Sequence, residues 1–181
     1  MSELSMYDIA FAFTKTDKTD AILLVEGKKM HVNKALLSYH SDYFNTLFNS
    51  EIEEESMEEI EIKDVDFKNF ATLLSLMQDD PLDIYKLQIE HLLKLADRFL
   101  LKGPKRIVEQ ITYVTTAFTR FEKLQIADRC DSEFLMQRML NHDYGTRETF
   151  KDFHASNWNT LSSAAKSKIA DKFFPMYANK L

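Results

Sequence analysis

The sequence contains few of the residues that build loops, cross-links or metal sites. It has 3 glycines and 3 prolines in 181 residues, which argues against a loop-rich β sandwich and favours helices. The single cysteine, Cys130, excludes a disulfide framework and a cysteine-based zinc site. No apolar run approaches the ~18 residues that a membrane-spanning helix needs, and residues 1–18 lack the pattern of a signal peptide. These absences predict a soluble protein of the cytoplasm or nucleus with no membrane partner.

The charge balance also narrows the possible partners. The chain carries 23 basic and 29 acidic residues, a net charge of -6, so binding to a nucleic-acid backbone is not expected. The 14 phenylalanines and 7 tyrosines fall mainly on helical stripes, without the interleaved basic residues that base stacking would need. Hydrophobic residues make up 45% of the chain, which is enough for a packed core.

Hydrophobic periodicity predicts a mixed first part and a helical second part. Residues 20–26 read as a buried strand, with Gly27 and Lys28 turning the chain into a second strand over 29–32. Ile60 and Ile62 alternate with charged residues and indicate a third strand. Helices are expected between and after these strands, and only helices after Pro104. The expected helices cover 33–37, 41–48, 66–77, 89–101, 104–118, 120–128, 132–140, 146–154 and 162–174.

Residues 1–19 precede this pattern and are harder to assign. Ile9, Phe11 and Phe13 alternate with two alanines, which indicates a short strand. Because such a segment is too apolar to remain in water, we expect it to add to a sheet edge, in its own chain or in a partner by exchange.

No pattern indicates catalysis, a cofactor or a metal. The glycines are isolated, so no phosphate-binding loop is present, and the five histidines form no pair at helical spacing. His31 is expected to be a structural hydrogen-bonding residue and Cys130 a small buried side chain. We therefore expect the protein not to be an enzyme.

The least usual local feature is an acidic run over residues 51–61, which holds seven glutamates and no basic residue. One interpretation is a solvated turn between a helix and a strand. The other is a recognition loop, in which Ile52 is an apolar anchor and Glu54 a nearby carboxylate. Composition alone favours the solvated turn and leaves the recognition loop as the alternative.

Three stretches carry a family resemblance: DAILLVEGKKMHVNKALLSYHSDYFNTLF at 20–48, IEIKDVDFKNFATLL at 60–74 and IEHLLKLADRFLL at 89–101. They resemble the BTB/POZ domain, most closely that of MATH–BTB proteins, although no MATH domain precedes it in this sequence. The matching positions are Asp20, Gly27, Lys34, Leu37, Ser41, Phe44, Leu92, Leu93, Ala96 and Asp97. The helices after Pro104 are similar to the three-box or BACK-like extension that follows such domains.

The resemblance implies an α+β fold, a small three-stranded sheet clad by helices, followed by an all-helical extension. It places the BTB/POZ domain at residues 20–117 and the extension at 118–181, after the N-terminal segment 1–19. It also implies a role in protein–protein interaction, since family members often bind the N-terminal domain of cullin-3 and bring a protein substrate to a ubiquitin ligase.

Cullin-binding members carry an apolar–x–Glu motif after the Ser-x-x-Phe helix. The matching residues here are Ile52 and Glu54, with Phe48 at the end of the preceding helix. The resemblance thus favours the recognition interpretation of the acidic run.

The family also forms homodimers and heterodimers. By resemblance, Asp20 and Lys34 match a charged pair near the dimer axis, and Phe11 and Phe13 are further candidates for the dimer interface. Two hypotheses follow: a substrate adaptor for a cullin-3 ubiquitin ligase, or an oligomerising BTB scaffold with no role in ubiquitin transfer.

Overall fold

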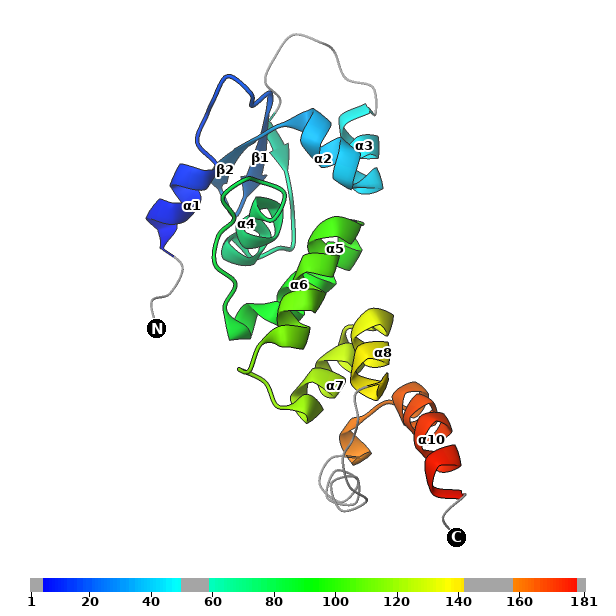
Figure 1. Cartoon of the computed structure of the whole chain (residues 1–181). Helices are drawn as coiled ribbons and strands as arrows, with labels where there is room; N and C mark the ends of the chain where they lie inside the picture. The colour runs from blue at the N-terminus through cyan, green and yellow to red at the C-terminus, as the bar shows by residue number, and fades with distance from the viewer. Residues whose placement is uncertain (1–4, 50–58, 142–157, 179–181) are drawn as a thin grey trace. The chain divides into compact units, whose positions relative to one another are not determined.

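The protein is described here from a computed structural model that covers residues 5–49, 59–141 and 158–178 (Figure 1). The chain divides into two compact units, Met1–Val108 and Glu109–Leu181. The division falls within helix α6, Lys102–Val114, which begins in the first unit and ends in the second.

The first unit combines a small sheet with several helices (Figure 1). In chain order its elements are α1 (Met6–Ala12), β1 (Ala21–Val25), β2 (Lys28–Val32), α2 (Lys34–His40), α3 (Asp42–Asn49), β3 (Glu59–Glu61), α4 (Phe67–Ser75), the 3-10 turn η1 (Lys86–Gln88), α5 (Ile89–Arg98) and the start of α6.

The sheet has the strand order β2-β1-β3. Strands β1 and β2 form an antiparallel hairpin, and β3 pairs parallel to β1 on its other side. The hairpin turn uses Glu26 and Gly27, both with positive φ (49° and 73°), so it lies one residue earlier than predicted. Two left-handed residues match the twist of a two-residue hairpin, and glycine adopts this conformation without steric cost. The prediction of three strands is confirmed.

The core of this unit lies between the sheet and the helices. Leu23 of β1 and Met30 of β2 are fully buried, as are Leu92 and Leu93 of α5. An aromatic cluster joins α3, α4 and α5: the Phe44 and Phe99 rings stack with centroids 5.7 Å apart, and Phe70 tilts against Phe99 at 5.1 Å.

The N-terminal segment corrects one prediction. Residues 9–13 do not form a strand, because Met6–Ala12 is the helix α1, capped by the Ser5 hydroxyl, which accepts a hydrogen bond from the Tyr7 N–H. Ile9 and Phe13 lie four residues apart and are both buried, whereas Phe11 between them is 71% exposed. Helical spacing therefore explains the apolar pattern that resembled a strand.

The predicted helix at 89–101 is shorter than expected. α5 ends at Arg98, and Leu100 adopts a left-handed conformation (φ 53°) while the Leu101 N–H donates to the Ala96 carbonyl oxygen at 2.8 Å. This bond closes a Schellman turn, which usually places glycine at the left-handed position. Gly103 was expected to end the helix, but it lies in the first turn of α6, together with Pro104.

The second unit is helical wherever it is described. After the end of α6 it contains α7 (Arg120–Arg129), α8 (Glu133–Asn141), the 3-10 turn η2 (Trp158–Thr160) and α10 (Ser163–Ala178). Thr119 and Glu122 form a capping box at the start of α7, and the Ser132 hydroxyl caps α8 as predicted. The predicted helix at 146–154 lies outside the described residues, and the domain boundary at 117 stays a prediction.

Three buried polar side chains in the described part of the second unit have hydrogen-bond partners: Lys123, Ser132 and Glu109. The Lys123 ammonium donates to the carbonyl oxygens of Tyr113 and Thr115, both at 2.6 Å, and so satisfies two acceptors at the end of α6. Burial lowers the pKa of this lysine. The Ser132 hydroxyl donates to the buried Glu109 carboxylate at 2.6 Å.

The first prediction concerns the core of the first unit. Leu93→Asp should unfold it, because an unpaired buried charge costs several kcal/mol against a typical total stability of about 5–15 kcal/mol. Circular dichroism melting checks this. Lys94→Asp, at the exposed neighbouring position, is the control and should melt near the parent. An unchanged melting temperature for Leu93→Asp would contradict the packing.

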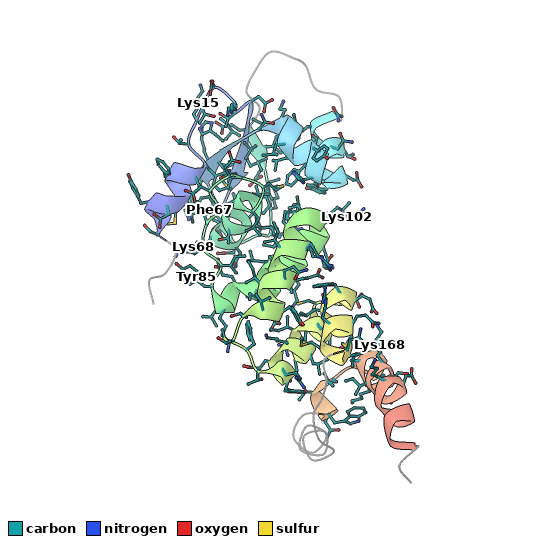
Figure 2. The ribbon with its side chains drawn as sticks, in the orientation of Figure 1. Lys15, Phe67, Lys68, Tyr85, Lys102 and Lys168 are labelled. Carbon is teal, nitrogen blue, oxygen red and sulfur yellow. The ribbon has the colours of Figure 1, made fainter. Side chains whose placement is uncertain are left out.

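The second prediction concerns Lys123. Lys123→Met should lower the free energy of unfolding by about 1–3 kcal/mol, because two partly buried carbonyl groups lose their donor. The control is Lys168→Met, which removes only an exposed ion pair with Glu133 (Lys168 is labelled in Figure 2) and should cost about 0–1 kcal/mol. Denaturant titration compares the two, and equal losses would refute a special role for Lys123.

Candidate interaction surfaces

Helix α3 leads into the acidic run and is firmly anchored in the core. The Ser41 hydroxyl accepts the Phe44 N–H at 3.1 Å and donates to the Phe99 carbonyl oxygen at 2.6 Å. Since Ser41 and Phe99 are 58 residues apart, one side chain joins the start of α3 to the end of α5. Phe44 itself is fully buried. The direction of α3 is thereby fixed.

Of the three predicted cullin-binding residues, the structure describes only Phe48. Ile52 and Glu54 lie outside the described residues. Phe48 lies in the last turn of α3, is half-buried, and stacks on Phe44 at 5.9 Å between ring centroids. The Lys34 ammonium lies 6.0 Å from the Phe48 ring centroid, at the limit of a cation–π contact. The Phe48 ring is thus partly accessible and held from two sides.

The structure brings the predicted pair Asp20 and Lys34 together, but through the backbone. The Asp20 carboxylate accepts the Lys34 backbone N–H at 2.7 Å, while the Lys34 ammonium faces Phe48. Asn33 supports the same corner, because its side chain caps α2 and donates to the Lys18 carbonyl oxygen. Asp20 therefore fixes the start of α2, and its role at a dimer axis stays a prediction.

The two phenylalanine candidates differ sharply. Phe13 is 3% exposed and belongs to the core of its own chain, whereas Phe11 faces solvent beside Tyr7, four residues earlier on α1. Sequence reasoning missed this exposed aromatic pair because it read the segment as a strand. The i, i+4 spacing of Ile9 and Phe13, with Ser5 as a cap, was the signal that could have found it.

A cavity of about 540 Å³ lies among β2, the segment 13–19 and the ends of α2 and α4. His31 contributes to its wall. The His31 backbone N–H donates to the Phe13 carbonyl oxygen at 3.1 Å, while its buried Nδ1 atom has no hydrogen-bond partner among the described residues. The predicted hydrogen-bonding role therefore holds for the backbone of His31 and not for Nδ1.

The described residues hold no group of three or more metal-ligating side chains. Within the same residues, no helix is long and apolar enough to cross a membrane. Cys130 is buried, as its sequence context predicted. The surface features described above are exposed apolar side chains with charged residues near them. Such surfaces are suited to binding another protein.

The model of the BTB/POZ domain family matches residues 12–116, more than half of the chain. The chain belongs to the BTB/POZ family. A BTB domain is a protein-interaction domain, and the sheet with its cladding of helices is the fold that the sequence resemblance implied. The match begins at Ala12, the last residue of α1, and the expected domain start at residue 20 stays a prediction.

Several relatives share this BTB domain. BTB and MATH domain-containing protein 36 of Caenorhabditis elegans is 28% identical over 166 residues, which cover 90% of this chain and 51% of the relative. TD and POZ domain-containing protein 3 of Mus musculus is 26% identical over 172 residues, covering 90% and 45%. The chain thus spans about half the length of these relatives. Among solved structures, the BTB domain of human gigaxonin is similar to this chain, with 19% sequence identity and a TM-score of 0.46. The match covers 61% of this chain and 96% of the gigaxonin chain.

The third prediction tests the anchoring of α3. Ser41→Ala should lower the free energy of unfolding by about 1–3 kcal/mol, because the change removes a helix cap and leaves the Phe99 carbonyl without its donor. Denaturant titration measures this loss. Thr46→Ala removes an exposed hydroxyl on the same helix and is the control. If both variants lose the same stability, Ser41 does not anchor the helix.

Proposed function

We propose that the protein is a non-enzymatic substrate adaptor that binds the N-terminal domain of cullin-3 and brings a protein substrate to a ubiquitin ligase in the cytoplasm or nucleus. Membership of the BTB/POZ family supports the role in protein interaction. Relatives named as BTB and MATH domain-containing proteins support the choice of an adaptor.

The observation that carries the cullin-3 assignment is the position of the apolar–x–Glu motif. Ile52, Glu53 and Glu54 follow α3 by three to five residues, and α3 ends at Asn49. The last turn of this helix offers the half-buried Phe48 ring, so an apolar anchor and a partly exposed aromatic side chain stand close in sequence. Such anchors beside a charged rim are typical of protein interfaces.

In this mechanism the protein performs no bond chemistry itself. Ile52 inserts into an apolar pocket of cullin-3, and Glu54 either holds the turn or accepts a hydrogen bond at the rim. The acidic residues around them raise the rate of association with a basic surface. This gain in rate becomes smaller as salt is added.

The alternative is a BTB scaffold that forms homodimers or heterodimers and has no ubiquitin-ligase role. The exposed Tyr7 and Phe11 pair on α1 favours it, since another BTB chain could bury these rings. The two functions differ at Ile52 and Glu54, because a scaffold does not need that surface.

The fourth prediction separates them. Ile52→Asp should abolish or weaken binding to the cullin-3 N-terminal domain by about tenfold to a hundredfold or more, since burial of one isoleucine contributes about 1.5–3 kcal/mol. Isothermal titration calorimetry with the full chain measures the affinity.

Glu58→Ala removes a nearby charge in the same acidic run and is the control, which should bind as the parent does. If the parent does not bind, or if Ile52→Asp binds equally well, the adaptor function is rejected in favour of the scaffold.

A further inference from the structure

A groove of about 600 Å³ runs between α1 and the segment 78–85 that precedes η1. Its volume lies in the range of about 300–1,000 Å³ that is common for ligand sites in proteins. Both walls belong to the first unit. Tyr85 stands on the wall opposite α1 and is labelled in Figure 2.

The groove is lined by exposed aromatic rings. Tyr7 and Phe11 lie four residues apart on α1, are 77% and 71% exposed, and both contribute to its wall. Tyr85, half-buried, contributes from the other side. Large aromatic side chains so exposed on one helix face are unfavourable in water and are characteristic of binding surfaces.

The position of α1 makes this wall rigid. Ile9 and Phe13 are buried on the opposite face of the helix, so Tyr7 and Phe11 are presented by an anchored element. Ser5 caps the helix and fixes its first turn. A partner therefore meets a wall that is already ordered, which reduces the entropy cost of binding.

All charged residues that line the groove are acidic. Asp8 on α1 and Asp80 and Asp83 on the opposite segment line it, and no lysine, arginine or histidine is among its lining residues. Because Arg and Lys pair with carboxylates and also lie favourably over aromatic rings, both features select for a basic side chain. A second copy of the same surface would instead bring like charges together, which is unfavourable.

We propose that this groove docks an extended segment of a partner protein that carries arginine or lysine next to apolar side chains. The inference rests on the proposed function in one respect only, since the adaptor role makes the partner a target protein. In that role the groove provides a surface that recruits the target.

The fifth prediction tests this groove with a phage-displayed library of random dodecapeptides selected against the full chain. Recovered peptides should be enriched in Arg or Lys beside Leu or aromatic residues. The dissociation constant of a synthetic peptide from the selection, measured by fluorescence anisotropy, should rise about tenfold or more in Asp80→Lys/Asp83→Lys and in Tyr7→Ser. It should also rise as salt is added.

Two controls match these changes. Asp17→Lys reverses an exposed charge outside the groove, and Tyr39→Ser removes a tyrosine that is 85% exposed on α2; both should bind the peptide as the parent does. Circular dichroism confirms that each variant is folded. The peptide experiment contains no cullin. A negative result in it therefore rejects the docking groove without bearing on the cullin-3 calorimetry.

Three outcomes would overturn the inference. The first is that no peptide is recovered, or that the recovered peptides bind the groove variants and the parent equally. The second is that the recovered peptides are acidic or uncharged. Finally, light scattering could find a dimer for the parent and a monomer for Tyr7→Ser, which would make a second copy the occupant.

Discussion

The hydrogen bond from the Ser41 hydroxyl to the Phe99 carbonyl oxygen is the contact on which the first unit depends most. It ties the start of α3 to the end of α5, and the Phe44 and Phe99 rings stack just beside it. A buried hydroxyl that both caps a helix and satisfies a distant carbonyl admits little freedom, because either lost bond would leave a buried polar group unpaired. The direction of α3, and so the starting point of the acidic run, follows from this one side chain.

The scarcity of glycine has a visible consequence in the backbone. Leu100 and Asp131 take the left-handed conformation that ends a helix, and the residue after each donates to a carbonyl five residues earlier. Left-handed geometry costs a residue with a Cβ atom about 1–2 kcal/mol, which the Schellman hydrogen bonds and the packing of the next residue offset. At the first of these turns Leu100 is left half exposed and Leu101 is fully buried. The turn thus redirects the chain so that α6 begins from an anchored residue.

Local rules predicted most of this fold. Asn33, Asp66 and Ser132 cap helices as their positions before apolar stripes indicated, and the alternation around Ile60 found the third strand. Apolar periodicity failed at α1, because Ile9, Phe11 and Phe13 fit a strand and a helix equally well. Burial of Ile9 and Phe13 in the core favours the helix.

Long-range partners were beyond such rules. The Glu26 carboxylate accepts the Phe67 N–H, 41 residues away, and the Arg98 guanidinium donates to the carbonyl oxygens of Lys63 and Asp64. The acidic groove has the same origin, since Asp8 and Asp80 line it together only after α1 has packed against α4. Family resemblance was enough to locate the candidate motif at Ile52 in the sequence. The exposed aromatic surface of α1 could be found only from the three-dimensional structure. The aromatic side chains of α1 and α3 are thus held on separate elements, each anchored in the core by its own buried residue, Ile9 in α1 and Phe44 in α3.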